Sequence, residues 1–160
     1  FTLRNSFEVV LIHSSIIQPQ THQTKNKETA IPKSNVKTQY SKDEPMLNND
    51  GLCEITIDNS KNDMPVYVRI WDMSSQSPIR AFTINKSEKF TAKNITPGKY
   101  EIRYKELYEN DVPSFGAKSE PVNLEQTELD NGTQYSKISF TLYKVKNGNA
   151  RVSQIPVDDI

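Results

Sequence analysis

The chain has 160 residues, in which 20 basic and 20 acidic residues balance to zero net charge and hydrophobic residues make up only 34%. This length allows one domain of ordinary size and a tail, and the low apolar content requires the core residues to be concentrated in one region. The chain carries 6 basic and 5 acidic residues up to Asp50, and 14 basic and 15 acidic residues after it. Neither part has the basic excess that binding to a phosphate backbone requires, which excludes nucleic acid as a partner.

The first residues contain two short apolar patches, Val9–Ile12 and Ile16–Ile17, which do not amount to a membrane span. A transmembrane helix needs about 20 consecutive apolar residues, and no run in the chain approaches this length. A signal peptide is also poorly matched, because Glu8 interrupts the rise from Arg4 and no small-residue cleavage site follows. We therefore predict no transmembrane segment in this chain.

Residues 1–50 as a whole are predicted to lie outside the folded domain. From Pro19 to Asp50 the chain is rich in Gln, Thr, Lys, Asn, Ser and Pro, and its few apolar residues follow neither a helix nor a strand period. Such a composition cannot offset the entropy of ordering the backbone, about 1–2 kcal/mol per residue. We predict a disordered or weakly structured linker that tethers a domain at residues 51–160 to an N-terminal anchor or domain. An artefact of the gene model is the alternative.

From Gly51 onward, apolar and polar residues alternate over short segments, which is the pattern of half-buried β-strands. The alternation predicts strands at Cys53–Asp58, Val66–Trp71, Ile79–Ile84, Glu88–Ala92, Lys99–Leu107, Ser119–Leu124 and Tyr135–Val145. Seven strands within about a hundred residues, with no helix-period segment between them, predict an all-β fold, an antiparallel seven-stranded sandwich of two sheets. The tail from Gly148 to Ile160 is predicted either to add an edge strand or to trail free.

The best-defined local structure is the corner from Phe90 to Tyr104, which contains a turn between two strands. Pro97 presets its backbone angle, and Gly98 is free to adopt a positive φ, as a tight turn requires. After the turn, Tyr100, Ile102 and Tyr104 alternate with Glu101, Arg103 and Lys105. We interpret the corner as a structural feature that identifies the type of sandwich.

The segment Phe82–Tyr104 resembles the repeated theme of prealbumin-like, carboxypeptidase-regulatory-type sandwiches. That theme has an aromatic residue, a small apolar residue before Pro-Gly, and a Tyr that opens an alternating strand, here at Phe90, Ile95, Pro97, Gly98 and Tyr100. The closing strand Phe140–Asn149 is similar to C-terminal domains of uncharacterised bacterial envelope proteins. The resemblance implies a sandwich that is Ig-like in the broad sense and serves as a binding, spacing or docking module of the cell envelope, periplasmic or membrane-associated.

Fibronectin type III modules offer an alternative resemblance, because they use a similar phrase at the corner between their strands E and F. Pro97–Tyr104, followed by Ser119–Val122, fits that phrase. Against it, the chain lacks the early-strand Trp of such modules, and the strong strand Tyr135–Val145 follows the point where they end. The alternative function is therefore a fibronectin-III-like or carbohydrate-binding module of a larger extracellular protein.

Residues that carry familiar catalytic chemistry are scarce in the predicted domain. His13 and His22 both precede it, which removes His-dependent triads and most zinc sites. Cys53 is the single cysteine, so no intramolecular disulfide or thiolate cluster can form, and we predict that it is a buried core residue. The five glycines are isolated and form no phosphate-binding loop. We therefore predict a protein that is not an enzyme and has no cofactor.

Carboxylates are the remaining source of site chemistry. Glu106, Glu109 and Asp111 cluster in one loop, and calcium prefers several oxygen ligands from such a loop. Their spacing lacks the alternating-ligand pattern of a calcium loop, so they are weak calcium candidates and a solvated loop is favoured. An enzyme that relies on carboxylates alone is the third functional alternative.

The predicted binding residues are Tyr67, Arg69 and Trp71, which lie on the face of their strand opposite the apolar residues Val66, Val68 and Ile70. An arginine between two aromatic residues suits contact with protein or with glycan. The alternative is that this face covers the edge of the core or packs under the C-terminal tail. The predicted partner is another protein or another domain of the same protein, with a glycan as the alternative.

Overall fold

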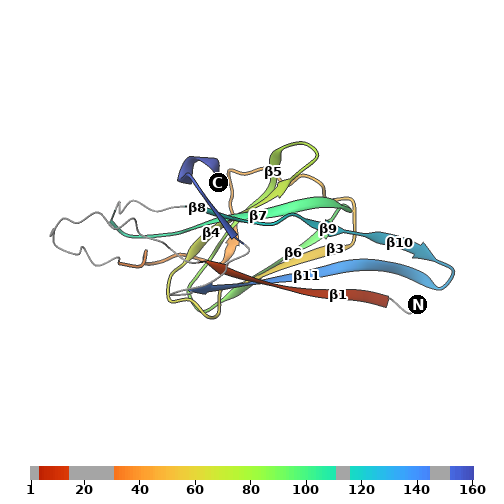
Figure 1. The fold of residues 1–160 in the computed structure, drawn as a ribbon, viewed down its shortest axis with the longest axis horizontal. Helices are drawn as coiled ribbons and strands as arrows, with labels where there is room; N and C mark the ends of the chain where they lie inside the picture. The colour runs from red at the N-terminus through yellow and green to blue at the C-terminus, as the bar shows by residue number, and fades with distance from the viewer. Residues whose placement is uncertain (1–3, 15–30, 111–115, 145–151) are drawn as a thin grey trace.

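The computed structural model of the chain describes residues 4–14, 31–110, 116–144 and 152–160, and these residues form two β-sheets (Figure 1). The first sheet has five strands: β1 (Arg4–Ser14), β3 (Cys53–Asp58), β6 (Lys89–Ile95), β10 (Gln126–Leu129) and β11 (Gly132–Lys144). The second has seven: β2 (Gln39–Tyr40), β4 (Val66–Asp72), β5 (Ser77–Ile84), β7 (Gly98–Glu106), β8 (Gly116–Ser119), β9 (Val122–Leu124) and β12 (Val152–Ile155). A 3-10 turn, η1 (Val157–Asp159), follows β12. Within these ranges no helix is long and apolar enough to cross a membrane.

The all-β prediction is confirmed, whereas the prediction of seven antiparallel strands is wrong. The five-stranded sheet has the order β1-β11-β3-β6 with β10 also paired to β11, and β11 runs parallel to both β1 and β3. The seven-stranded sheet has the order β12-β8-β7-β4-β5-β2, and β9 also pairs with β7. All neighbouring strands in this sheet are antiparallel. Parallel neighbours need a long crossover, and here the connection from β3 to β11 runs through the other sheet.

The two sheets pack as a sandwich around one apolar core. Nine inward-facing residues of β3, β4 and β11 are each at most 3% exposed: Cys53, Ile55, Ile57, Val66, Val68, Ile70, Ile138, Phe140 and Leu142. Burying one such aliphatic or aromatic side chain stabilises the fold by about 1.5–3 kcal/mol. The prediction that Cys53 is buried is confirmed, and burial raises the pKa of its thiol, so the thiol is neutral.

The additional strands lie where the sequence carries little strand pattern. Pro121 interrupts the predicted strand Ser119–Leu124 and leaves β8 and β9 on either side, because proline cannot donate a ladder hydrogen bond. β10 is almost wholly exposed, so it shows no alternation of apolar residues. It pairs with β11 through a turn in which Gly132 has a φ of 140°, a conformation that favours glycine.

Several of residues 31–50, which we expected in the linker, contact the sandwich. β2 pairs with β5, and the ring of Tyr40 contacts Phe90 edge-on with centroids 4.8 Å apart. The backbone N–H of Leu47 donates to the carbonyl of Ile79 over 3.0 Å. Backbone hydrogen bonds from an irregular segment leave no periodic pattern in the sequence, which is why these contacts were not predicted. Of the remaining linker, β1 pairs with β11, and residues 15–30 lie outside the described residues.

The corner between β6 and β7 is built differently from the predicted turn. Gly98 does not have a positive φ, and the positive φ near this corner belongs to Asn94, at 57°. Gly98 packs closely instead: a Cβ there would lie 3.2 Å from the Tyr100 side chain, which would have to shift by a few tenths of an ångström. The Tyr100 hydroxyl donates to the Thr96 carbonyl over 2.8 Å and accepts from Asn48 Nδ2 over 3.0 Å. The corner is therefore held by a tyrosine side chain that is only 1% exposed.

Candidate binding face on the seven-stranded sheet

The predicted residues Tyr67, Arg69 and Trp71 lie together on the outer side of β4, away from the core. Their side chains are half-buried, in strict alternation with buried neighbours. On the adjacent strand β7, Lys105 is opposite Tyr67, Arg103 is opposite Arg69, and Glu101 is opposite Trp71. Residues directly opposite in an antiparallel pair share one side of the sheet. These six residues form what we term the outer face.

Arg103 of the outer face is held by contacts to Trp71 and Glu101. Its guanidinium carbon lies 3.6 Å from the centre of the Trp71 ring, a cation–π contact. Its Nε and Nη2 both lie 2.7 Å from Glu101 Oε1, and the Glu101 side chain is only 3% exposed. Glu101 and Arg103 were not predicted as site residues from the sequence, although the alternation along β7 puts both on the outward side.

Arg69 is fixed by a second group of contacts, to Tyr67 and Glu44. Its Nε donates to the Tyr67 hydroxyl over 2.9 Å, that hydroxyl donates to Glu44 Oε1 over 2.9 Å, and Arg69 Nη2 pairs with the same carboxylate oxygen. The hydrogen bond from Arg69 holds the pKa of Glu44 below its ordinary value. Burial raises the pKa of Tyr67, so its hydroxyl stays protonated as a donor. Glu44 was missed because it falls in the segment expected to be a linker.

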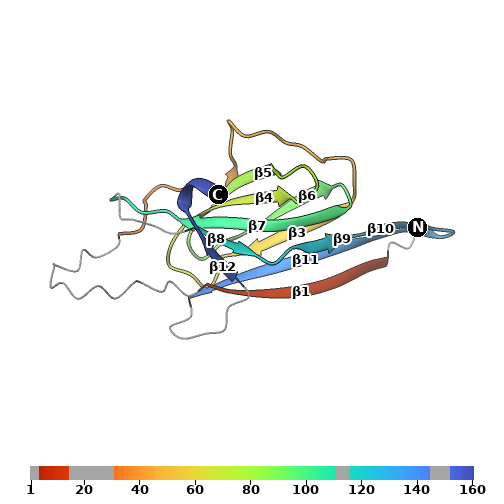
Figure 2. The same cartoon turned by 45° about the horizontal axis from the view of Figure 1, so that its top comes forward.

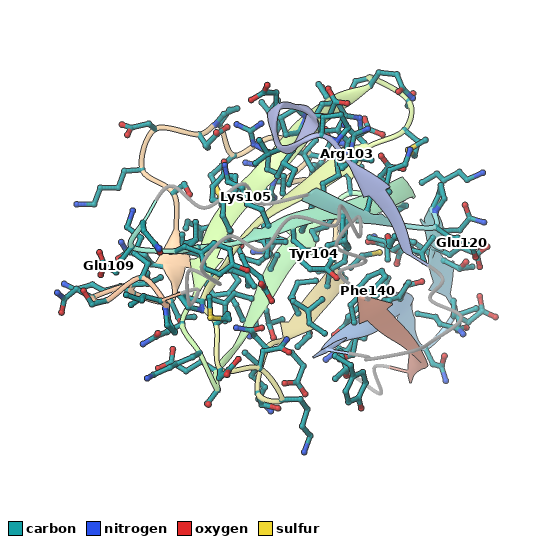
Figure 3. All side chains as sticks on the ribbon, turned by 60° about the vertical axis from the view of Figure 1, so that its left-hand side comes forward. Arg103, Tyr104, Lys105, Glu109, Glu120 and Phe140 are labelled. Atoms are coloured by element: carbon teal, nitrogen blue, oxygen red, sulfur yellow. The ribbon has the colours of Figure 1, made fainter. Side chains whose placement is uncertain are left out.

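The C-terminal residues lie across part of the outer face. Arg103 Nη1 donates to the Asp159 carbonyl over 2.7 Å, and Arg69 Nη1 donates to the Ile160 oxygen. Ile160 is 5% exposed and packs on Gly116, where an added Cβ would lie 2.3 Å from Ile160 Cδ1. Figure 3 shows Arg103 beside this segment. The alternative in which the face packs under the tail therefore describes the surroundings of Arg69 and Arg103.

Two groups of the outer face have hydrogen-bonding capacity left over. Lys105 is half-buried with its ammonium 5.6 Å from the centre of the Tyr67 ring, and it forms no ion pair with any residue that the structure describes. The indole N–H of Trp71 is buried and has no acceptor among the same residues. The indole N–H is not accessible from outside, so the free capacity of this face is the ammonium of Lys105, which suits acceptor atoms, carboxylates above all.

Of the weak calcium candidates, the structure describes Glu106 and Glu109, and their carboxylates have different partners. Glu106 accepts a hydrogen bond from the Tyr108 hydroxyl, whereas Glu109 accepts from the backbone N–H and hydroxyl of Ser34. Those bonds from Ser34 lower the pKa of the exposed Glu109 carboxyl. Asp111 lies outside the described residues. In the described ranges, no group of three metal-capable side chains comes together.

A buried polar cluster at the corner was not predicted from the sequence. Arg80 is 1% exposed, and its guanidinium donates to the carbonyls of Ile79 and Asn48 over 3.1 and 3.4 Å. Its Nε has no partner in the described part of the chain. Nearby, burial would raise the pKa of Asp72, but hydrogen bonds from Ser74, Ser75 and Asn48 outweigh burial and lower it. The side chain of Asn48 links this cluster to Tyr100.

Comparisons with protein-family models, with curated proteins and with solved structures found no match to this chain. A functional assignment therefore rests on the geometry of the outer face.

Proposed function

We propose that this chain is a non-enzymatic β-sandwich module that binds another protein, or another domain of its own protein, through the outer face. One observation carries the proposal: Lys105 is a half-buried cation without an ion pair among the described residues, within a surface whose other side chains are already held in place. Tyr, Trp and Arg are the residues most enriched at the energetic centres of protein interfaces. A face built from them, half-buried and hydrogen-bonded, has the composition of such a centre.

Pre-organisation supports this assignment. Immobilising a long side chain on binding costs about 0.5–1.5 kcal/mol. Arg103 is already held by Glu101 and Trp71, and Arg69 is held by Tyr67 and Glu44. A partner therefore meets an ordered surface and avoids most of that cost.

The charges of the outer face indicate the chemistry of the partner. The cations are Arg69, Arg103 and Lys105, and the carboxylates paired with them are Glu44 and Glu101. The excess positive charge is Lys105, which lies opposite Tyr67 of β4 and has no carboxylate paired with it among the described residues. We infer that the partner presents an acidic or carbonyl-rich segment to this position.

A protein partner is favoured over a glycan by the position of Arg103. Sugar rings commonly stack on an exposed aromatic face, and the ring of Trp71 already has Arg103 on one side at 3.6 Å. The ammonium of Lys105 suits a carboxylate of a peptide. A carbohydrate-binding module is therefore the second candidate.

The type of sandwich is also part of the proposal, with a prealbumin-like sandwich, Ig-like in the broad sense, as the leading type. β3 pairs with β6 in one sheet and β4 with β7 in the other, as strands B and E, and C and F, do in immunoglobulin-type sandwiches. A tyrosine at the start of strand F that bonds back to the backbone also occurs in that group, and Tyr100 does so here. This feature favours the fibronectin-III-like alternative as strongly, and both types are docking modules.

We further propose that the module belongs to a bacterial cell envelope, either periplasmic or membrane-associated. The support is the resemblance of Phe140–Asn149 to domains of envelope proteins. A single buried cysteine is compatible with that compartment.

The test is capture of interacting proteins by the full chain, with one charge reversed. Lys105→Glu is compared with Lys89→Glu, which reverses an exposed lysine on the other sheet. We expect the unaltered chain and Lys89→Glu to retain the same partner, and Lys105→Glu to lose about tenfold in affinity, since like charges then face each other. Equal binding by all three chains would contradict the proposal.

Two parallel measurements separate the alternatives. A glycan array that gives Lys105-dependent binding, with no protein captured, would establish the carbohydrate-binding alternative. Turnover on a panel of hydrolase substrates that is lost in Glu106→Gln would establish a carboxylate enzyme. We expect neither signal.

A further inference from the structure

β1 occupies one border of the five-stranded sheet and pairs with β11 along its whole length. The parallel register runs without a shift from Arg4 opposite Gln134 to Ser14 opposite Lys144. Figure 2 shows the two strands side by side at the border of the sandwich. The edge of β11 from Gln134 to Lys144 therefore pairs with an added strand of eleven residues, and we term this edge the β1 seat.

The seat on β11 has to be filled for the sandwich to be complete. The opposite edge of β11 pairs with β3 and β10. If β1 were absent, the backbone from Gln134 to Lys144 would become an open edge, directly beside the buried core residues Phe140 and Leu142. A long open edge next to apolar residues is a template for pairing with another chain.

β1 can leave this seat without disturbing any other described pairing. It is the first strand that the structure describes, and the next described pairing is the bridge between Pro32 and Tyr108. The 17 residues at positions 15–31 span up to roughly 60 Å when extended. That reach is sufficient to place β1 on a neighbouring molecule.

We propose that β1 is an exchangeable strand, and that the β11 edge binds β1 of a second copy of this chain in the same parallel register. Exchange between two copies makes every strand pair that the single chain makes, so it requires no new complementary surface. The second copy is the favoured occupant because its residues 4–14 are the sequence seated on this edge. Pairing of β1 with its own chain competes with exchange, and its effective concentration is fixed by the connecting residues. Pairing between two copies becomes more frequent as the protein concentration rises, so exchange is expected to increase with concentration and on refolding.

The test uses pairs of full chains that each carry one new cysteine. Val9 lies opposite Ser139 in the register, so one chain carries Val9→Cys and the other, distinguished by a tag, carries Ser139→Cys. The two are unfolded, mixed, refolded together and oxidised. We expect a disulfide-linked heterodimer on a non-reducing gel. Only exchange brings the two introduced thiols, on different chains, to the Cα separation of about 4.4–6.8 Å that a disulfide requires.

The matched control replaces Ser139→Cys by Thr133→Cys, on the same strand but before the first residue that β1 pairs with. That site is about 20 Å from residue 139 along the strand. We expect about tenfold less heterodimer with it, because only collisional linking remains. The unaltered chain is a second control, since its only cysteine, Cys53, is buried.

A single chain that carries both Val9→Cys and Ser139→Cys tests the seat itself. Intramolecular linking in this chain, together with no heterodimer in the mixture, would overturn exchange. No linking in either experiment would overturn the seating of β1 on β11. Equal heterodimer with Ser139→Cys and Thr133→Cys would also overturn the proposal, and none of these results bears on the outer face, which lies on the other sheet.

Discussion

The guanidinium of Arg103 lies between the indole ring of Trp71 and the carboxylate of Glu101, 3.6 Å from the ring centre and 2.7 Å from the carboxylate oxygen. The ion pair is largely buried, because the side chains of Arg103 and Glu101 are 14% and 3% exposed. A charge in such a position depends on its partner far more than a surface charge does. The same side chain therefore contributes to the stability of the sandwich and to the geometry of the proposed binding face.

Replacing Arg103 with methionine should therefore destabilise the protein mainly through the carboxylate that it leaves behind. Arg103→Met is expected to lower the free energy of unfolding by about 3 kcal/mol, since breaking a buried pair leaves an uncompensated charge. Adding Glu101→Gln should restore much of that loss, because the neutral amide no longer needs a cation. Urea denaturation of the two single variants and the double variant measures this. Additive losses in the double variant would show that the pair is not coupled.

The outward alternation of β4 could be predicted from the sequence, because Val66, Val68 and Ile70 mark the core side unambiguously. The partners of that face could not. Glu44 comes from an irregular segment and the Ile160 oxygen from the end of the described chain, and no local pattern links either to β4. Contacts between residues far apart in sequence are set by tertiary packing, which periodicity does not encode.

Glu44 is expected to give the stability of the protein a defined dependence on pH. Its pKa in the folded protein is lowered from 4.5, chiefly by the hydrogen bond from Arg69. A lowered folded pKa contributes stability that is fully present above the unfolded pKa and is lost as the pH falls through the folded pKa. The difference in unfolding free energy between the unaltered chain and Glu44→Gln should therefore be present at neutral pH and vanish in acid.

The measurement is urea denaturation of both chains at a series of pH values below and above 4.5. Because Glu44 is partly exposed, the difference at neutral pH should stay below about 1 kcal/mol. The matched control is Glu120→Gln, at an exposed glutamate that forms no ion pair with any described residue, which should change the free energy of unfolding by less than about 0.5 kcal/mol. A difference that grows as the pH falls would contradict the assignment.

The Tyr100 hydroxyl is expected to stabilise the corner between the two sheets. Tyr100→Phe leaves the ring in the core but removes the bonds to the Thr96 carbonyl and Asn48 Nδ2. Leaving buried polar groups unsatisfied costs about 1–3 kcal/mol, so a loss in that range is expected on denaturation. Tyr40→Phe is the control, because the Tyr40 hydroxyl has no hydrogen bond to any described residue. Equal effects of the two substitutions would show that the corner bond contributes nothing.

The corner also shows where turn chemistry misleads. Pro97-Gly98 correctly marked a change of direction, but the glycine serves the packing of the Tyr100 ring, and the left-handed residue is Asn94. Asparagine is among the residues that most readily adopt this conformation. The same limit applies to the fold as a whole: alternation located the strands of the core, whereas the parallel placement of β11 beside β1 and β3 depends on the packing of complete sheets.

Tyr40 decides whether residues 31–50 form part of the folded domain. Its ring packs edge-on against Phe82 and Phe90, with centroids 6.0 and 4.8 Å apart, and the strand that carries it pairs with β5. Aromatic pairs of this kind contribute about 0.5–1.5 kcal/mol beyond the burial of their surface. Tyr40→Ala should therefore lower the unfolding free energy by about 2–3 kcal/mol, since the buried surface of the ring is lost as well.

The control is Leu129→Ala, at an exposed apolar residue of β10, which should change the unfolding free energy by less than about 0.5 kcal/mol. If Tyr40→Ala were as neutral as Leu129→Ala, residues 31–50 would be a linker in solution, and Glu44 would not be available to hold Arg69.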